Sequence, residues 1–237
     1  MREGAFYLRL STKPKIKENL NSQLYKKIIR RYPNIPVYTV GDLVDRGNRS
    51  SDVFEFVITN NILFTPGNHD YMFFHFFKDP QSVFARSWFF NGNESTLESY
   101  SNKETEMFQH IELIKLAPLY FNLPDCFISH AGISNYYEKL LPPNYLDGLE
   151  ILDSFIRNDL RSDRGILWTR DPLLNIGKLQ VVGHTTKHEI TLAEDSNAVY
   201  LDTGVFLGNK LSAIIVHESN IIETIEEKTH FEDIIKS

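Results

Sequence analysis

Four short polar segments, each placed directly after an apolar run, carry the side chains with the clearest chemical potential. They supply one carboxylate, one amide oxygen and two imidazoles: Asp42, Asn68, His130 and His184. A mixed nitrogen and oxygen set of this kind suits a borderline divalent ion such as Mn, Fe or Zn. If the fold brings the four segments together, these residues predict a metal site.

Each of these residues also has a simpler explanation when it is taken alone. Asp42 follows an apolar run, where an aspartate often caps a helix or a turn, and Asn68 stands beside Gly67 as a turn residue would. A single histidine after a glycine is more often a hydrogen-bonded structural residue than a ligand. Four such segments after four apolar runs argue against coincidence, so we interpret them as parts of one metal centre.

The elements expected from periodicity give these segments a reason to meet. Buried strands are predicted at the apolar runs 36–40, 62–65, 126–129, 179–182, 198–201 and 211–216. Helices are predicted at 16–31, 51–59 and 103–116. Strands that alternate with helices, followed by several strands close together, indicate an α/β protein with a mixed sheet or two packed sheets. Ligand sites in open α/β sheets gather beyond the carboxyl ends of the strands, which is where the polar segments begin.

The composition excludes several classes of protein. With 237 residues, of which 42% are hydrophobic and 24% charged, the chain fits a folded globular protein and not a disordered one. A formal charge of -6 argues against a general nucleic-acid binder. No apolar run reaches the roughly 18 residues needed to span a bilayer. The first residues do not resemble a secretory signal, and the one cysteine, Cys126, allows no intrachain disulfide, so we expect a cytoplasmic protein.

Charge is distributed unevenly along the chain. The residues before Asp42 hold nine Lys or Arg side chains and two acids, Glu3 and Glu18. We interpret this basic segment as the solvated face of a helix and not as a nucleic-acid arm. No internal repeat, low-complexity tract or linker divides the chain, so residues 1–237 are expected to form one domain.

The polar segments also resemble the motifs of a known enzyme family. Gly41–Gly47 and Gly67–Asp70 are similar to the second and third signature motifs of the phosphoprotein phosphatase branch of the calcineurin-like metallophosphoesterases. His130 in Ser-His-Ala-Gly and His184 in Val-Gly-His-Thr match the later metal histidines of this family. Further stretches resemble its bacterial phosphatases and diadenosine tetraphosphatases: Trp88–Asn93, Thr96–Leu97, Ser99–Tyr100, Leu167–Arg170 and Leu201–Gly204. The resemblance covers about residues 37–216, with Asn93 in place of a second glycine.

The resemblance implies a fold and a metal centre. The expected fold is a metallophosphoesterase β-sandwich of two mixed sheets flanked by helices, with a two-metal centre at one end. Two divalent ions about 4 Å apart hold a phosphate and generate a hydroxide for in-line attack. Asp42 would bridge both ions, and the second ion's shell would be completed by Asn68, His130 and His184. Manganese is the expected metal, with Fe and Zn as alternatives.

The resemblance also implies catalytic roles for residues beside the ligands. His69 would protonate the leaving oxygen, and Asp45 would orient His69 through a carboxylate–imidazole hydrogen bond. Arg46 and Arg170 would bind phosphate oxygens, for which a guanidinium fork is well shaped. Arg170 has an alternative explanation as the partner of Asp171 or another acid in a surface ion pair.

The first signature motif of the family is missing. This motif, Gly-Asp-x-His-Gly, should follow an opening strand near Ala5–Leu8 and supply an aspartate and a histidine to the first ion. The chain reads Arg-Leu-Ser-Thr-Lys-Pro at 9–14, and no Asp or His precedes Asp42. Arginine and lysine side chains only donate hydrogen bonds, so they cannot act as ligands in its place. The residues present fully support one ion, whereas the family has two.

Three explanations of this departure remain open. The chain is a degenerate phosphatase with one ion, or the opening residues, about 1–35, are a misread start of a complete gene product. In the third explanation, Lys13 or Arg9 replaces the charge of the first ion. We favour the misread start, because an abrupt loss at one end with every later motif intact is typical of a boundary error.

The function implied by the resemblance is metal-dependent hydrolysis of phosphate monoesters, first of all by a serine/threonine phosphoprotein phosphatase. A symmetrical dinucleoside tetraphosphatase is the alternative within the family, because it shares nearly all the motifs. A non-catalytic phosphate-binding or regulatory module is the alternative from another class, and the missing Asp and His favour it. The expected partner is a phosphorylated protein or a small phosphoester, and neither nucleic acid nor a membrane is expected.

Overall fold

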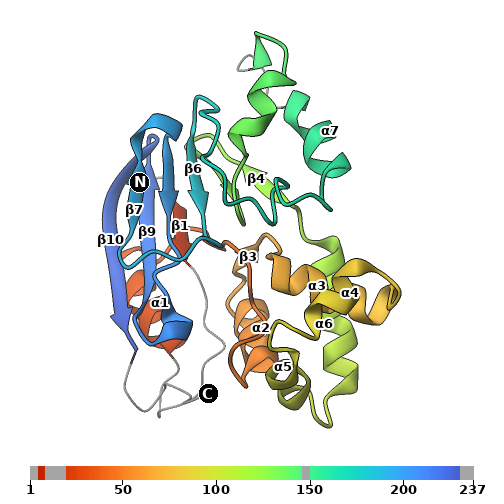
Figure 1. Cartoon of the computed structure of the whole chain (residues 1–237). Helices are drawn as coiled ribbons and strands as arrows, with labels where there is room; N and C mark the ends of the chain where they lie inside the picture. The colour runs from red at the N-terminus through yellow and green to blue at the C-terminus, as the bar shows by residue number, and fades with distance from the viewer. Residues whose placement is uncertain (1–4, 9–19, 146–149, 230–237) are drawn as a thin grey trace.

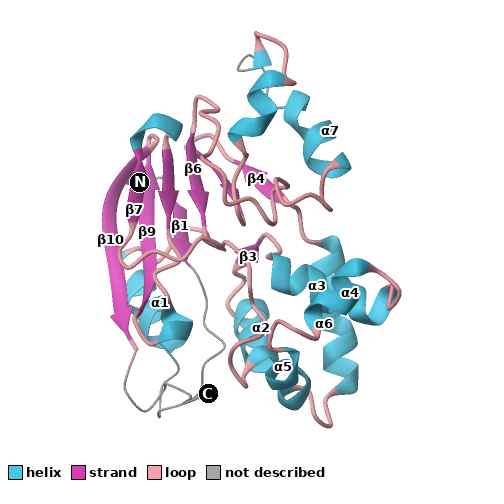
Figure 2. Cartoon of the chain, in the orientation of Figure 1, coloured by secondary structure: helices cyan, strands magenta, loops and turns pink. Residues whose placement is uncertain are grey.

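The computed structural model describes residues 5–8, 20–145 and 150–229 as strands, helices and the segments between them (Figures 1 and 2). The strands are β1 (Ala5–Leu8), β2 (Val37–Thr39), β3 (Leu63–Phe64), β4 (Tyr120–Asn122), β5 (Cys126–Ser129), β6 (Leu179–Val182), β7 (Thr191–Ala193), β8 (Ala198–Tyr200), β9 (Lys210–His217) and β10 (Asn220–Lys228). The α-helices are α1 (Leu20–Arg31), α2 (Ser50–Thr59), α3 (Asn68–Lys78), α4 (Val83–Trp88), α5 (Asn93–Ser99), α6 (Glu104–Leu116) and α7 (Glu150–Asn158). Short 3-10 helices are η1 (Asn135–Lys139), η3 (Glu194–Ser196) and η4 (Val205–Leu207).

The strands form two mixed five-stranded sheets. The first has the order β10-β9-β1-β2-β3 and the second the order β4-β5-β6-β8-β7. β1, β2 and β3 run parallel to one another, while β9 and β10 are antiparallel additions. In the second sheet β5, β6 and β8 are parallel, and β4 and β7 are antiparallel at the two edges. The predicted fold of two mixed sheets with flanking helices is therefore confirmed.

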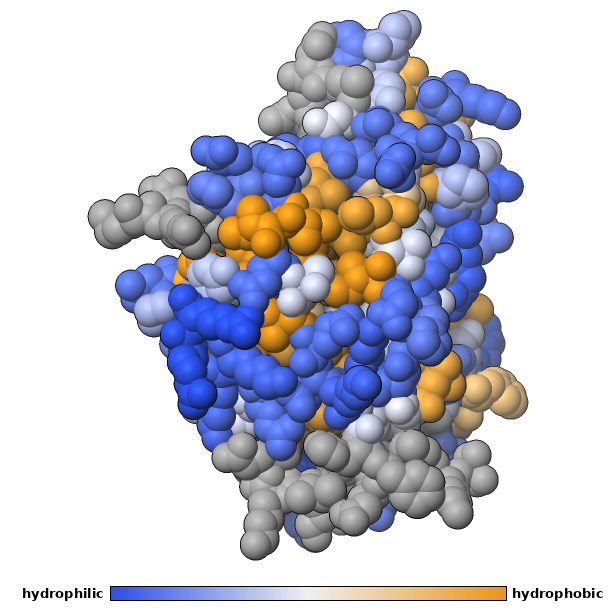
Figure 3. Space-filling model, turned by 90° about the vertical axis from the view of Figure 1, so that its left-hand side faces the viewer, coloured by the Kyte–Doolittle hydropathy of each residue, from blue (hydrophilic) through white to orange (hydrophobic). Residues whose placement is uncertain are grey.

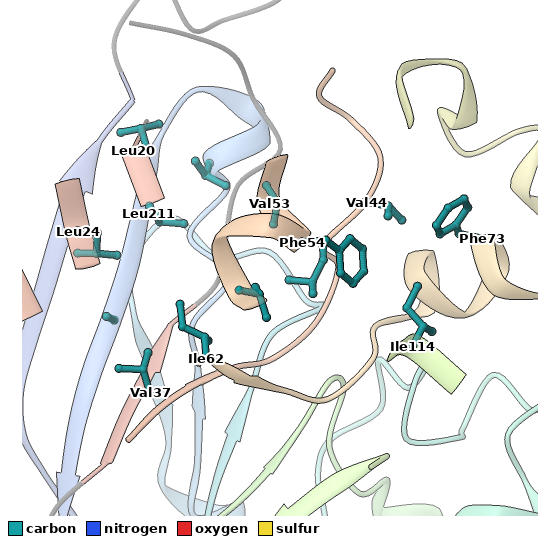
Figure 4. Packing of buried hydrophobic residues seen from close by; sticks show 14 of the residues in the cluster. Leu20, Leu24, Val37, Val44, Val53, Phe54, Ile62, Phe73, Ile114 and Leu211 are labelled. Atoms are coloured by element: carbon teal, nitrogen blue, oxygen red, sulfur yellow. The ribbon is translucent and has the colours of Figure 1, made fainter. Parts of the chain in front are cut away.

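The period-two alternation of the strands separates the core into layers. Tyr38 of β2 and Ile214 of β9 belong to one buried cluster with Ile128 of β5 from the opposite sheet, so this cluster fills the space between the sheets. Val37, next to Tyr38, and Leu211 of β9 belong to a second cluster, which packs the outer face of the first sheet against helices (Figure 4). A third cluster covers the outer face of the second sheet beneath α7. This layering accounts for helices on both sides of the sandwich.

Most of the elements predicted from periodicity are present. The helices predicted at 51–59 and 103–116 occur as α2 and α6, and the predicted strands occur as β2, β3, β5, β6, β8 and β9. The helix predicted at 16–31 is present from Leu20 onward as α1, whereas 16–19 lie outside the described residues. The elements that periodicity missed are the short α4, α5, β4 and β7, the helix α7, and β10, in which isoleucine and glutamate do not alternate strictly.

The outermost strands β7 and β10 lie on the same side of the sandwich, at the left of Figure 1. Figure 3 views this side and shows hydrophobic residues gathered near the middle of the face, with hydrophilic residues around them. Glu223 and Glu227 of β10 form ion pairs with Arg31 and Lys27 of α1, which keeps the long edge strand charged. Within the described ranges, no helix combines the length and apolar character needed to cross a bilayer.

Candidate active site

The four polar segments meet where the two sheets approach each other. Two of them follow the parallel strands β2 and β3 of the first sheet, and two follow the parallel strands β5 and β6 of the second. His130 Nδ1 lies 2.6 Å from the carbonyl oxygen of Val40, and the Gly183 N–H donates to the His130 carbonyl at 2.8 Å. These contacts join the end of β2 to the ends of β5 and β6 and bring the polar side chains to one place.

The donor atoms of the predicted metal ligands face one another. His130 Nε2 lies 3.0 Å from Asn68 Oδ1, 3.2 Å from His184 Nδ1 and 3.5 Å from Asp42 Oδ1. His184 Nδ1 lies 3.1 Å from the same Asn68 oxygen. In the part of the chain that the structure describes, His, Cys, Asp and Glu side chains alone form no cluster of three or more able to hold a metal ion. The arrangement therefore depends on the amide oxygen of Asn68.

In His130 and His184, the ring nitrogen that points away from the site determines which nitrogen carries the proton. His130 Nδ1 is paired with the Val40 carbonyl, and His184 Nε2 lies 3.0 Å from the Trp168 carbonyl. A carbonyl only accepts, so each of these nitrogens carries the proton and the nitrogen facing the site has a lone pair. Burial, followed by the neighbouring His130, lowers the pKa of His184 to about 3 and keeps it neutral.

This donor set fits a divalent cation. Two imidazole nitrogens, an amide oxygen and a carboxylate oxygen converge in a buried space. Acceptors brought together out of water repel one another and lose hydration, and a bound cation reverses both effects. The backbone carbonyls behind the two histidines are the outer partners that orient ligating imidazoles in metal sites.

The backbone of the site is held in conformations that ordinary residues avoid. The φ angles of Asp42, Asp45 and Arg46 are 57°, 69° and 60°, and that of His184 is 56°. Positive φ in a non-glycine residue is uncommon, and it gathers at functional sites where the surrounding structure enforces it. At Gly67 a Cβ atom would lie 2.5 Å from the Asp42 backbone nitrogen, so only glycine lets this loop approach the metal carboxylate.

Asp70 joins the loop that carries Asp42 to the loop that carries Asn68, a role that the sequence does not predict. Its carboxylate accepts hydrogen bonds of 2.8 Å from the N–H groups of Asp42, Leu43 and Gly67. Burial, together with the nearby Asp42 carboxylate, raises the pKa of Asp70 to about 7. The sequence signal for this role is the position of Asp70 at the end of the Gly-Asn-His-Asp segment, beside Asn68 and His69.

His69 and Asp45 form a buried pair beside the four predicted metal ligands Asp42, Asn68, His130 and His184, which we call the ligand cluster. His69 Nδ1 lies 2.6 Å from Asp45 Oδ2. The same carboxylate accepts from Trp88 Nε1 at 2.8 Å and from Thr96 Oγ1 at 2.7 Å. Burial raises the pKa of Asp45, whereas these three donors stabilise its charged form. Trp88 and Thr96 lie in stretches that resemble the family motifs, but the sequence does not predict that they contact Asp45.

Both predicted phosphate-binding arginines are exposed. Arg46 Nη2 lies 3.0 Å from His69 Nε2. Arg170 is close enough to His184 for its charge to lower the pKa of that imidazole. Asp171 accepts a hydrogen bond from Ser134 Oγ at 2.7 Å.

The segment expected to carry the missing first motif, 9–14, lies outside the described residues, but the strand before it is present. Leu8 of β1 stands opposite Thr39 of β2 in a parallel pair, so the chain leaves β1 at the edge from which the Asp42 loop also leaves. Asn93, where the bacterial stretch has glycine, is buried, and its Oδ1 has no hydrogen-bond partner in the described part of the chain.

The chain matches a family model and a curated relative. Residues 19–216 match a family model described as calcineurin-like phosphoesterase. A curated relative, the asymmetrical bis(5'-nucleosyl)-tetraphosphatase PrpE of Anoxybacillus flavithermus, is 28% identical over 194 residues, which are 74% of this chain and 73% of that protein.

Two solved structures share the fold. The cold-active protein-tyrosine phosphatase of a Shewanella species has 14% identity and a TM-score of 0.57, with 95% of this chain and 80% of that chain covered. A protein provisionally assigned as a diadenosine tetraphosphatase has 16% identity and a TM-score of 0.56, with 95% of this chain and 94% of that chain covered. At such low identity these structures establish the common fold and not a common substrate.

Proposed function

We infer the function from one premise: the chain belongs to the calcineurin-like phosphoesterase family, whose members are metal-dependent hydrolases of phosphoesters. We propose that this chain hydrolyses a phosphate ester or phosphoanhydride, with a dinucleoside tetraphosphate, cleaved at a phosphoanhydride bond, as its substrate, and that residues 1–237 act as one domain. The observation that carries the proposal is the convergence of two imidazole nitrogens, an amide oxygen and a carboxylate oxygen beside the buried His69–Asp45 pair. The tetraphosphate is favoured by the relative that aligns with about three quarters of the chain.

The residues that would hold a divalent ion are Asp42, Asn68, His130 and His184. When bound, such an ion supplies a Lewis acid that offsets the charge of the phosphate and lowers the pKa of a water molecule. The neutral state of His184 supports this role, because an imidazole binds metal through an unprotonated nitrogen. Mn is the metal that we propose, while Fe and Zn suit the same donors.

His69 is the proposed general acid. Its Nδ1–H donates to Asp45, and its Nε2 accepts from Arg46 Nη2 at 3.0 Å in this structure. When Nε2 is protonated it can donate that proton to the oxygen of the leaving group. The hydrogen bonds from Trp88 and Thr96 hold the Asp45 carboxylate in place, and the carboxylate in turn holds the imidazole ring in one orientation.

Arg46 and Arg170 are proposed to bind the phosphate oxygens. Both guanidinium groups are exposed and stand near the residues of the site, Arg46 beside His69 and Arg170 near His184. A guanidinium donates two parallel hydrogen bonds to two phosphate oxygens, which fixes the phosphate and neutralises charge as it develops.

A serine/threonine phosphoprotein is the second candidate substrate. It rests on the resemblance of Gly41–Gly47 and Gly67–Asp70 to the phosphoprotein phosphatase branch, a resemblance that the diadenosine tetraphosphatases share. The acid and the arginines act on the phosphate and the leaving oxygen, so they accept either substrate. The choice depends on what binds beyond the phosphate, and the products distinguish the possibilities.

The test is an assay of the purified chain with Mn against diadenosine tetraphosphate, a phosphoserine peptide and p-nitrophenyl phosphate. We expect hydrolysis of the tetraphosphate to ATP and AMP, as asymmetrical cleavage requires; two ADP would identify the symmetrical reaction, and preference for the peptide would identify a protein phosphatase. His69→Asn should reduce the rate by about 10²- to 10⁴-fold. His188→Asn is the matched control, since this histidine is exposed. No hydrolysis of any substrate would contradict the proposal.

A further inference from the structure

The stretch Leu201–Gly204 resembles the family motifs but contributes no side chain to the ligand cluster or to the His69–Asp45 pair. Its aspartate builds a turn. Asp202 Oδ1 accepts from the Gly204 N–H at 3.1 Å, and Asp202 Oδ2 accepts from Thr186 Oγ1 at 3.0 Å. The turn is thereby tied to the loop that follows His184, and the residues after Gly204 start from a fixed position.

The 3-10 helix η4 follows this turn and presents Phe206. The glycines at its two ends, Gly204 and Gly208, have φ angles of 71° and 88°, which suit glycine and close the helix after one turn. Val205 is buried in the helix-facing hydrophobic core, whereas Phe206 is only half-buried. The ring of Phe206 is therefore held at the surface by a turn that is anchored on both sides.

Phe206 contacts the arginine of the active site. The Arg46 Cζ atom lies 4.3 Å from the centroid of the Phe206 ring, and Arg46 Nη2 lies 3.0 Å from His69 Nε2. An exposed arginine side chain has many rotamers, and an aromatic face near the guanidinium selects among them. Stacking uses the flat face of the guanidinium, so the N–H groups in its plane that are not directed at His69 Nε2 stay available to a phosphate.

We propose that Phe206 is a positioning residue that holds the Arg46 guanidinium ready to bind the substrate phosphate. The effect on catalysis rests on the proposed function, in which Arg46 binds phosphate. The ordering of the Arg46 side chain by Phe206 does not depend on that function. On this proposal the Leu201–Gly204 stretch serves the active site indirectly, because it places a ring beneath an arginine contributed by the first sheet.

The test compares three variants of the full chain. Phe206→Leu removes the aromatic face and keeps an apolar side chain, Phe206→Tyr keeps the face, and Leu207→Ala changes an exposed neighbour in the same turn as a control. We expect Phe206→Leu to raise the Kd for inorganic phosphate, measured with Mn present, and the KM for p-nitrophenyl phosphate by about 3- to 10-fold. Phe206→Tyr and Leu207→Ala should retain the wild-type values, and kcat should change less than KM.

A spectroscopic measurement separates this inference from the proposed function. The NMR signal of the Arg46 Nε–H should exchange faster with solvent in Phe206→Leu than in the wild type, without any substrate. In an Arg46→Ala background, Phe206→Leu should have no further effect on the Kd for phosphate. Unchanged Arg46 exchange, or equal weakening of phosphate binding in both backgrounds, would overturn the proposal. If the wild type neither binds nor hydrolyses phosphate compounds, the proposed function fails while the exchange comparison still decides the role of Phe206.

Discussion

Two segments that leave neighbouring parallel strands at the same edge of one sheet differ greatly in their chemistry. The segment after β2, Gly41–Gly47, holds two carboxylates and an arginine, and its backbone is fastened by Asp70. The segment after β1, 9–14, holds Arg9 and Lys13 but no carboxylate and no imidazole. β1 is nevertheless paired in register between β2 and β9. Strand placement and ligand chemistry are therefore separable: apolar residues suffice to build β1, while a metal ligand requires particular atoms.

This difference bears on the number of ions. The segments after β2, β3, β5 and β6 bring four acceptor atoms together, which fits one ion. An ion on the β1 side would have Asp42 as its recognised ligand in this sequence. Three kinds of variant test this comparison. The first removes a predicted ligand from the segments after β2, β3, β5 and β6, and the second supplies ligands to the segment after β1. The third changes Asp70, which joins the loops.

The largest effect is expected from removing the shared oxygen of the ligand cluster. Asn68→Ala deletes the atom that lies near both His130 Nε2 and His184 Nδ1. We expect Mn binding to be lost and hydrolysis to fall by about 10³-fold, since a metal supplies several kcal/mol of charge stabilisation. Metal analysis of the purified protein and initial rates measure the two effects. Asn122→Ala, at an exposed end of β4, serves as the control. A full complement of Mn in Asn68→Ala would show that the cluster is not the ion site.

The next effect concerns the segment after β1. Leu10→Asp combined with Thr12→His supplies the aspartate and histidine that the family motif has and this sequence lacks. We expect a second ion per chain and a rise in rate of about 100-fold, because two ions stabilise both the attacking and the leaving oxygen. Leu10→Asn with Thr12→Ala is the matched control. Equal activity in the wild type and the restored variant would reject the misread start as the explanation of the missing motif.

A smaller effect is expected on stability through Asp70. Its pKa is raised from 3.8 to about 7, so the folded protein favours the protonated form. The stabilisation that follows is fully present below pH 3.8 and is lost as the pH rises through about 7. Relative to Asp70→Asn, the metal-free wild type should lose about 1.4 kcal/mol of unfolding free energy per pH unit across this window. Urea unfolding of both proteins measures the difference, and a constant difference across the window would contradict the pKa rise.

The candidate site was predictable to the extent that its residues lie in short, recognisable segments. Asp42, Asn68, His130 and His184 each follow an apolar run, and buried strands place such residues at a common edge. The roles of Asp70, Trp88 and Thr96 were not predictable in this way. Each acts through a hydrogen bond to another part of the site, and the spacing of residue types along a chain does not specify such a partner.

The sequence by itself determined which atoms are available for chemistry and where the main strands and helices lie, because side-chain type and hydrophobic periodicity are local properties. Only the tertiary structure decided which nitrogen of each histidine faces the site, since that depends on the carbonyls of Val40 and Trp168 behind the rings. It also decided that Phe206 lies beneath Arg46. Contacts of this kind join residues that are distant in the sequence, and a pattern of burial encodes that a residue is covered without encoding what covers it.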